Sequence, residues 1–383
     1  MLKAEKILPN LLILLICLYY AQGILYASGS IVSQISLLGI LSLGLISIIK
    51  TCNPQNFKNS FFLFWTLLLT FNVIGFVFTS DLSNSIHVSN IKNILITSFS
   101  FYIIYYISKN GAWKIKHLYT FLIIIIPISI IQFYNYEKQQ LLLVNKKEIV
   151  NNISYTFVGF IPFLFYIKKR VYIIGLLLII LFFIFVSGKR GAAITGVFGI
   201  VVYLFYHFKL IAQKAKIKRL INYIGLSSLL YVFTIIGFRF LEKKAFLLER
   251  LSSGYASNRD ENYTQIFNHW YNSLDYINLI FGFGFGSSIN MNNEGVLAHN
   301  DWLELLSSFG LVGICIYTLL IYSFYKAIKD VKELNFKYSL FSILIMWLLI
   351  SLFSMFYNSL DSYIYCIVIG SVLGWNERNK IVK

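Results

Sequence analysis

The chain has 383 residues, of which 58% are hydrophobic and 13% charged, and its formal net charge is +17. A soluble protein of this length could not bury so much apolar surface, so the composition excludes a soluble fold and predicts a polytopic membrane protein. The positive charge does not indicate nucleic-acid binding, because Lys and Arg occur in small clusters between apolar runs. The cysteines lie in or beside apolar runs without a CxxC pair, so neither a disulfide nor a metal site is predicted.

A helix that crosses a membrane needs about 20 apolar residues. About twelve such segments are predicted, which gives a single all-α integral membrane domain over residues 1–383. The first is expected to be an uncleaved helix rather than a signal peptide, because a second apolar run follows almost at once. The predicted helices cover residues 7–27, 31–49, 61–79, 91–108, 118–134, 153–167, 171–187, 192–208, 220–238, 302–325, 338–356 and 360–375.

The distribution of Lys and Arg predicts the orientation of these helices. If the N-terminus is cytoplasmic, 22 of the 33 basic residues fall in inner segments, six in short outer segments and five in one long outer loop. Short cytoplasmic loops carry an excess of basic residues, whereas long loops contribute little to this rule. Both termini are therefore predicted to be cytoplasmic.

The long outer loop, residues 239–301, is the only stretch large enough for a small fold outside the membrane. Long loops in compact proteins are usually functional or disordered. This one contains Trp270 and several tyrosines, a composition too aromatic for disorder. A helix over 260–276 is predicted within it, with Ile266 and Trp270 at helical spacing.

Two basic residues occupy an unusual place in the short outer turn between the seventh and eighth predicted helices. Lys189 and Arg190 lie between Gly188 and Gly191, with apolar runs on both sides. In one interpretation both side chains extend to the outer lipid headgroups. In the other they form an anion site, because the flanking glycines let backbone N–H groups approach a phosphate at the positive end of the following helix.

His299 lies where the long outer loop turns into the tenth predicted helix. Asn300 is placed to cap that helix, and Asp301 complements its N-terminal dipole. The positive helix end also disfavours an imidazolium, which leaves a neutral base near pH 7. A plain surface histidine is the alternative, but none of the other histidines has a comparable setting.

Three absences narrow the class of protein. The sequence has no Asp-x-Asp, which a metal-dependent glycosyltransferase that uses nucleotide sugars would often show, and no GxxxxGK[ST] for ATP. The predicted helices carry no Asp or Glu at depth, since Glu304 and Asp361 fall near their outer ends. A proton-coupled carrier would need acidic residues at depth.

Residues 175–325 resemble the C-terminal signature of the bacterial O-antigen polymerase and O-antigen ligase family. Arg190 matches the arginine of its Ser-x-x-Arg-Gly segment, and Arg259 matches its Ser-Gly-Arg element. The chain departs from the pattern after Arg259, because Trp270 is eleven residues further on and Asn278 stands at the usual proline, so Arg250 is an alternative to Arg259. The other matches are the glycine ladder Gly282, Gly284 and Gly286, the pair His299 and Asn300, and Gly310-Leu311-Val312-Gly313.

The glycine ladder has two interpretations, since glycines in membrane proteins often only permit close packing. A dinucleotide-binding loop is excluded, because no βαβ context surrounds the ladder. The resemblance implies instead that these glycines support a site.

The resemblance implies transfer of a glycan from undecaprenyl diphosphate to an acceptor hydroxyl at the outer face of the bacterial cytoplasmic membrane. Arg190 and either Arg259 or Arg250 would hold the diphosphate, and His299 would take the acceptor's proton. Lys189, Asn300 and Asp301 would support this site, and no metal or cofactor is implied.

The family contains two activities that share these motifs. A polymerase joins one lipid-linked repeat unit to another, whereas a ligase moves the finished chain to lipid A-core. The divergent loop favours the polymerase, for which a chain-length regulator and a flippase are candidate partners. A polysaccharide flippase is the third interpretation, and it predicts a deep charged cavity and related halves that the sequence does not show.

Overall fold

The computed structural model describes residues 3–27, 29–52, 54–57, 59–79, 82–142, 150–212 and 259–381. These residues form helices and no β-strand, which confirms the all-α prediction. The predicted helix 220–238 and Arg250 lie outside the described residues.

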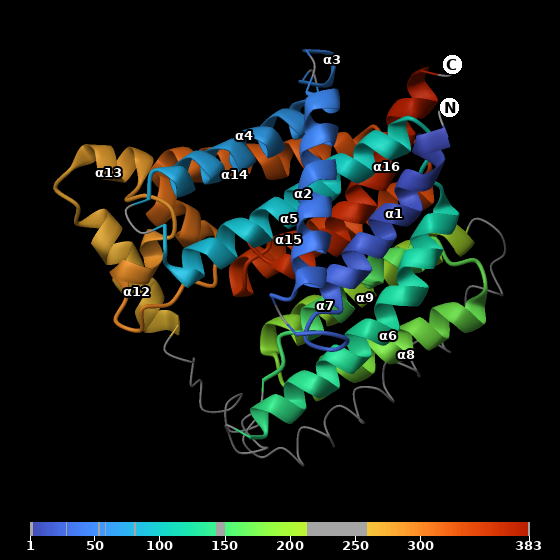
Figure 1. Cartoon of the computed structure of the whole chain (residues 1–383), viewed down its shortest axis with the longest axis horizontal. Helices are drawn as coiled ribbons and strands as arrows, with labels where there is room; N and C mark the ends of the chain where they lie inside the picture. The colour runs from blue at the N-terminus through green and yellow to red at the C-terminus, as the bar shows by residue number, and fades with distance from the viewer. Residues whose placement is uncertain are drawn as a thin grey trace.

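The elements before the long outer loop are α1 (Lys3–Tyr20), α2 (Ile31–Thr51), α3 (Pro54–Phe57), α4 (Ser60–Val77), α5 (Ser85–Lys109), α6 (Ile115–Gln140), α7 (Ser154–Val158), the 3-10 helix η1 (Ile161–Phe165), α8 (Arg170–Val186) and α9 (Arg190–Ala212). Those that follow are α12 (Arg259–Tyr271), α13 (Tyr276–Phe281), η2 (Ser287–Met291), α14 (Asp301–Lys329), α15 (Leu334–Phe353), η3 (Leu360–Ser362) and α16 (Tyr363–Ile381). Figure 1 shows their arrangement.

Seven of the described helices are long and apolar enough to cross a membrane, so the chain is a multi-pass membrane protein. They are α2, α4, α5, α6, α9 up to Lys209, α14 and α15. Shorter apolar helices occur at Ile7–Tyr20, Ser154–Phe165 and Arg170–Val186. The predicted count of twelve is therefore not confirmed.

The prediction of one continuous helix over 153–167 is wrong. The chain forms α7 and then the tighter η1, with Pro162 in the first turn of η1. Proline has no N–H to continue an α-helical ladder, so the helix breaks before it. Both pieces are buried, which makes this segment part of the core.

The prediction of one helix over 260–276 is correct at its start and wrong at its end. The helix α12 ends at Tyr271, and a second helix, α13, begins at Tyr276. Asp275 is the N-cap of α13, where its carboxylate accepts a hydrogen bond from the backbone N–H of Ile277 at 2.8 Å. A capping residue of this kind starts a new helix because it satisfies backbone donors that have no partner within the helix.

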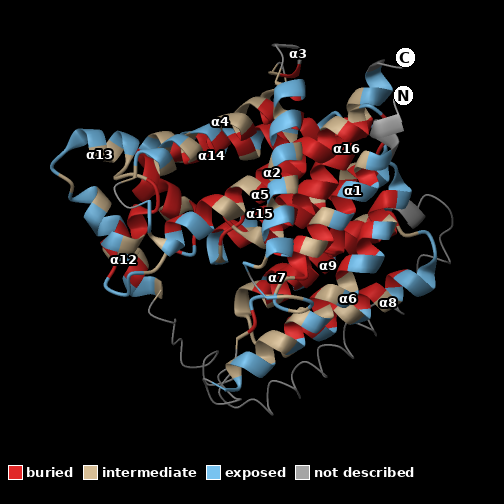
Figure 2. Cartoon of the chain, viewed as in Figure 1, coloured by how far each residue is buried: buried red, intermediate tan, exposed pale blue. Residues whose placement is uncertain are grey.

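The core centres on α5 and α16, which Figure 2 shows as largely buried helices. Gly370 and Gly374 lie one turn apart on α16, and a Cβ at either would come within 2.8 Å of a backbone carbonyl of α5. Small residues four apart allow two membrane helices to approach closely. This contact therefore fixes the centre of the bundle.

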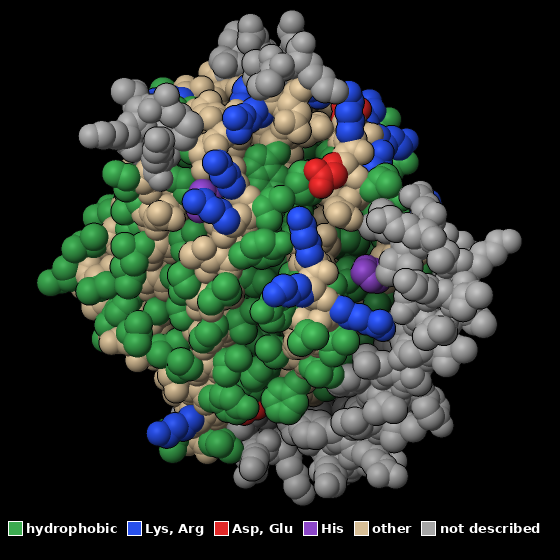
Figure 3. Space-filling model, turned by 90° about the vertical axis from the view of Figure 1, so that its right-hand side faces the viewer, with side chains coloured by type: hydrophobic (Ala, Val, Ile, Leu, Met, Phe, Trp, Pro, Cys, Tyr) green, Lys and Arg blue, Asp and Glu red, His purple; other side chains and the backbone are tan. Residues whose placement is uncertain are grey.

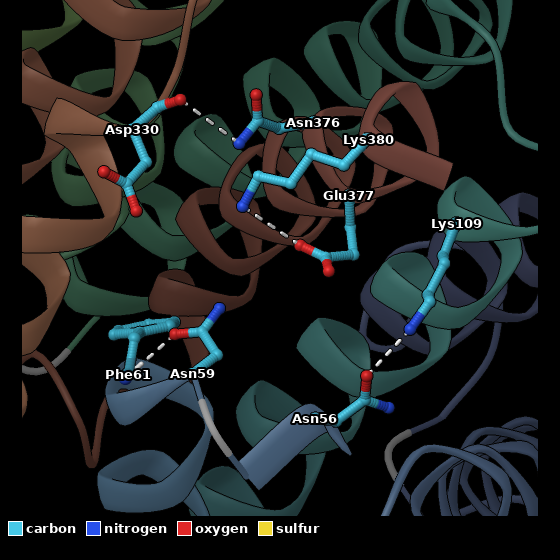
Figure 4. Close-up of polar contacts among 8 residues, drawn as sticks. All are labelled: Asn56, Asn59, Phe61, Lys109, Asp330, Asn376, Glu377 and Lys380. Atoms are coloured by element: carbon cyan, nitrogen blue, oxygen red, sulfur yellow. Dashed lines mark hydrogen bonds and ion pairs between the residues drawn. The ribbon is translucent and has the colours of Figure 1, made fainter. Parts of the chain in front are cut away.

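Both termini lie at one end of the molecule, and α12 and α13 lie at the other (Figure 1). Figure 3 looks onto the side that carries the termini and shows many Lys and Arg side chains there. Polar contacts at this end include Lys109 to Asn56 at 2.7 Å and Lys380 to Glu377 at 3.5 Å (Figure 4). The predicted orientation requires the termini and the long outer loop to lie at opposite ends of the molecule. That the end with the termini faces the cytoplasm stays a prediction.

We expect reporter fusions to place the end with the termini in the cytoplasm. A phosphatase that is active only after export should be active when fused at Tyr263 and inactive at the C-terminus or at Lys214, which lies outside the described residues. A fluorescent protein that folds only in the cytoplasm provides the matched control and should give the opposite pattern. Phosphatase activity at Lys214 would contradict this topology.

Candidate functional site

The structure contains a cavity of about 420 Å³ that has His299 in its lining. Its walls come from the start of α5, the segment around α7, the turn before α9, the residues before α14 and the segment between α15 and α16. The chemically active side chains on its lining are Tyr155, Lys189, His299 and Asp361. Elements distant in sequence thus meet at one hollow.

The backbone of His299 is held in an uncommon conformation. Its φ is 50°, and it is the only non-glycine residue with a positive φ among the described residues. Such a conformation costs about 1–3 kcal/mol and persists only where neighbouring structure enforces it. The hydroxyl of Tyr263 on α12 donates to the carbonyl of His299 at 3.4 Å.

Asn300 fixes His299 from the other side. Its side-chain oxygen accepts hydrogen bonds from the N–H groups of Trp302 at 2.9 Å and Leu303 at 3.2 Å, which confirms the predicted helix cap. Its amide nitrogen donates to the carbonyl of Leu352, at the end of α15, at 3.1 Å. The imidazole therefore projects from a backbone tied to two helices.

The surroundings of His299 favour the neutral form of its imidazole at pH 7. His299 is an exposed residue, and it lines the cavity. The pKa of His299 is lowered from 6.5 to about 4, first by desolvation of the ring and then by the positive charges of Arg259 and Lys189. A neutral ring nitrogen of this kind can accept a proton.

The structure brings two of the predicted cations to His299. Lys189 lines the cavity, and Arg259 is the first residue of α12, where its guanidinium donates to the carbonyl of Phe353 at 3.0 Å. Arg190 is half-buried at the start of α9 and is not among the residues that line this cavity. From the sequence, the diphosphate is assigned to Arg190 with Lys189 in support, and of the two only Lys189 lines this cavity.

Asp361 and Tyr155 are lining residues that the sequence did not assign to the site. The carboxylate of Asp361 accepts hydrogen bonds from the hydroxyls of Thr156 at 2.6 Å and Tyr20 at 3.2 Å. A Cβ at Gly191 would lie 2.2 Å from the Tyr155 hydroxyl oxygen, so this glycine makes room for the tyrosine. The sequence could have indicated Asp361, because it is a carboxylate at the outer end of a predicted helix. No sequence pattern indicated Tyr155.

The glycine ladder has a packing role. Gly310 adopts φ 59° and ψ −150°, which interrupts α14 and leaves carbonyls without their helical partners. The N–H groups of Phe283 and Gly284 donate to the carbonyls of Ser307 and Ser308, at 2.8 and 3.1 Å. None of Gly282, Gly284 and Gly286 lines the cavity. The packing interpretation is the one that these contacts support.

Two buried carboxylates in the first turn of α14 position the cavity walls. Asp301 accepts hydrogen bonds from the N–H of Phe356 at 3.0 Å and from the hydroxyl of Tyr317. Glu304 accepts from the Ser288 hydroxyl at 2.6 Å and from the N–H of Ala298 at 3.2 Å. Asp301 is therefore a positioning residue, in addition to its place at the helix dipole.

The described residues contain no group of three or more His, Cys, Asp or Glu side chains that could hold a metal ion. The carboxylates at the site already accept the hydrogen bonds given above. Lys189 and His299, which also line the cavity, are suited to an anion and to a proton.

Residues 175–318 match a family model described as O-antigen ligase. The resemblance predicted from the sequence is confirmed over this range, which includes Lys189, Arg190, Arg259 and His299. A comparison with curated proteins found no match. Tyr155 and Asp361 lie outside the matched range, so they join the site from parts of the chain that the family model does not cover.

We expect Gly282→Ala to destabilise the protein much more than Gly284→Ala. Both glycines have positive φ, 77° and 102°, so alanine is strained at either by about 1–3 kcal/mol. A Cβ at Gly282 would also lie 2.4 Å from the backbone N of Phe309, whereas nothing lies within 4 Å of a Cβ at Gly284. Thermal unfolding of the two purified variants in detergent measures the difference, and equal losses would contradict the packing role.

Proposed function

We propose that this chain, whose residues 175–318 match the O-antigen ligase family, transfers a glycan from a lipid-linked diphosphate to an acceptor hydroxyl. The observation that carries the proposal is a neutral histidine in a cavity with Lys189 and beside Arg259. Two cations suit a diphosphate, and a neutral imidazole suits an acceptor proton. The match supports a glycosyltransferase or ligase activity, and the identity of the donor is our proposal.

The proposed step is a single displacement at the reacting sugar. The acceptor oxygen forms a bond to the anomeric carbon while the bond from that carbon to the diphosphate oxygen breaks. His299 takes the proton of the acceptor hydroxyl, and the polyprenyl diphosphate leaves with the bonding electron pair. Arg259 and Lys189 stabilise the charge that develops on the leaving group.

Donor binding would also prepare the base. In the free protein Arg259 and Lys189 hold the pKa of His299 down. A bound diphosphate places negative charge beside the same cations, which raises the pKa of the imidazole toward neutral pH. His299 thus becomes a better base when the donor is in place.

Arg190 remains a proposed ligand of the diphosphate, beside Lys189 at the start of α9. The first N–H groups of a helix favour an anion, and the guanidinium can bond two of its oxygens. A lysine at this position provides only a point charge, so Arg190→Lys should lose most of the activity.

Of the two activities in the family, we propose the polymerase, which joins one lipid-linked repeat unit to another at the outer face of the bacterial cytoplasmic membrane. The divergent segment after Arg259 favours it. The ligase is the alternative, and the family match does not distinguish the two activities. Purified protein in lipid, offered either a second lipid-linked repeat unit or lipid A-core, should extend the repeat unit if it is a polymerase.

We expect His299→Ala to reduce turnover by about a hundred- to ten-thousand-fold, because it removes the general base. Donor affinity should change little, since the cations remain. Donor binding and turnover on purified protein in lipid nanodiscs, with chelator present, measure both quantities. Full turnover of this variant would remove His299 from the mechanism.

Arg259→Ala is the matched control and should show the opposite pattern. It removes a charged donor, so donor affinity should fall by roughly tenfold or more. Asn300→Ala should cost about 1 kcal/mol of stability from the lost helix cap and much less turnover than His299→Ala. If His299→Ala weakened donor binding as much as Arg259→Ala does, the histidine would be a diphosphate ligand and not the base.

The pH dependence of the transfer rate should reflect the lowered pKa of His299. The deprotonated ring is the reactive form, so the rate falls as pH drops through that pKa. Because the pKa in the free protein is lowered from 6.5 to about 4, kcat/KM should hold below pH 6.5 and fall toward pH 4. The acid limb of kcat, which reports the donor complex, should lie at higher pH.

Lys189→Gln tests whether nearby positive charge contributes to the lowered pKa of His299. Removal of this cation should raise that pKa and move the acid limb of kcat/KM to higher pH. Pre-steady-state and steady-state rates between pH 4 and 8 provide the profile. An acid limb in kcat/KM at the ordinary histidine value of 6.5 in both proteins would contradict this electrostatic account.

A further inference from the structure

A second hollow, of about 670 Å³, lies against α12 and is separate from the cavity of His299. Gln265, Asn268 and His269 line it from one face of the helix, at positions i, i+3 and i+4, and Asn272 follows directly after the last residue of α12. Phe283, Met291 and Asn293 form much of the opposite wall. We call this hollow the α12 groove.

Contacts within the groove define its shape. The rings of His269 and Phe283 lie 5.2 Å apart at 63°, edge to face. The side-chain oxygen of Gln265 accepts a hydrogen bond from the N–H of Asn293 at 2.9 Å, which ties the two walls together. Over the part of the chain that the structure describes, the exposed side chains of Asn268 and Asn272 form no hydrogen bond.

The chemistry of the groove differs from that of the cavity. Its lining contains no Lys, Arg, Asp or Glu side chain, so it offers nothing that neutralises a phosphate. Each asparagine amide provides two donors and an acceptor, which matches hydroxyl groups that both donate and accept. Phe283 and His269 add ring faces for apolar C–H surface. This combination suits an uncharged ligand with many hydroxyl groups.

The α12 groove is also placed to receive such a ligand from the cavity. Arg259 at the start of α12 acts on His299, and Asn268 is nine residues further along the same helix, which corresponds to about 14 Å at 1.5 Å per residue. A short oligosaccharide covers this distance.

We propose that the α12 groove binds the sugar residues of a lipid-linked glycan that lie beyond the reacting unit. This inference rests on the proposed glycan transfer and assigns a substrate-binding role to Asn268 and Asn272. Both side chains act on affinity for the glycan and not on the chemical step, because neither lines the cavity of His299.

The double variant Asn268→Ala/Asn272→Ala tests the proposal in the full-length protein in nanodiscs. Alanine favours helix more than asparagine does, so α12 should still form. The free oligosaccharide released from the native cell's surface polysaccharide should bind the wild type and bind the variant at least tenfold more weakly, as measured by calorimetry or saturation-transfer NMR. KM for the complete lipid-linked repeat unit should rise to a similar extent, while kcat stays within about twofold.

Two controls separate this role from general damage. Asn290→Ala changes an exposed asparagine of the same region that does not line the groove, and it should leave oligosaccharide binding unchanged. A lipid diphosphate that carries a single sugar is too short to reach Asn268, so the double variant should use it as well as the wild type does.

The outcomes distinguish this inference from the proposed function. Equal oligosaccharide binding by the wild type and the double variant, or no binding by either, would overturn the groove as a glycan site even if transfer is observed. The wild type could instead bind the oligosaccharide without transferring any glycan, while the double variant fails to bind it. That result would support the groove as a glycan site and reject the proposed reaction.

Discussion

The first turns of α14 supply the buried hydrogen-bond acceptors that hold the irregular segments around the site. Asp301 accepts from Phe356, Glu304 accepts from Ala298, and the carbonyls freed by the kink at Gly310 accept from Phe283 and Gly284. A buried backbone N–H without a partner costs free energy comparable to a lost hydrogen bond. Irregular backbone near a membrane is therefore tolerated only where such acceptors exist, and one helix end provides them here.

This arrangement explains why Gly282, Asp301 and Glu304 support the site without lining the cavity of His299. The backbones at Gly282 and Gly310 approach so closely that no Cβ fits between them. The strained backbone of His299 is held between the hydroxyl of Tyr263 and the helix cap at Asn300. Rigid support of this kind fixes a reactive side chain before the substrate arrives, which reduces the reorganisation needed during the reaction.

The sequence predicted the features that depend on local patterns. Apolar runs located most described helices, and the step from polar loop to apolar helix identified His299 and its cap Asn300. Periodicity could not show that Pro162 breaks a buried segment into α7 and η1, because a short apolar run has the same composition in either form. The end of α12 was missed because the cap at Asp275 lies within a run that continues the helical pattern.

The rest of the site depends on tertiary contacts that a single sequence does not contain. Tyr20, Thr156 and Asp361 are joined by hydrogen bonds across more than a hundred positions in the chain. Lys189 and Arg190 are neighbours with the same charge, and only the path of the turn decides that Lys189 faces the cavity. The packing role of the glycine ladder likewise appears only when Gly310 is placed against Gly282.

In the function that we propose, the helix α12 links charge recognition to sugar recognition. Its first residue, Arg259, belongs to the cationic site near His299, while its other end presents Asn268 and Asn272 to an uncharged groove. Side chains several turns apart on one helix keep a fixed distance, so the distance between the two sites is also fixed. Because the lining of the groove can change without altering the charges around His299, the same reaction can serve different glycans through substitutions on one face of this helix.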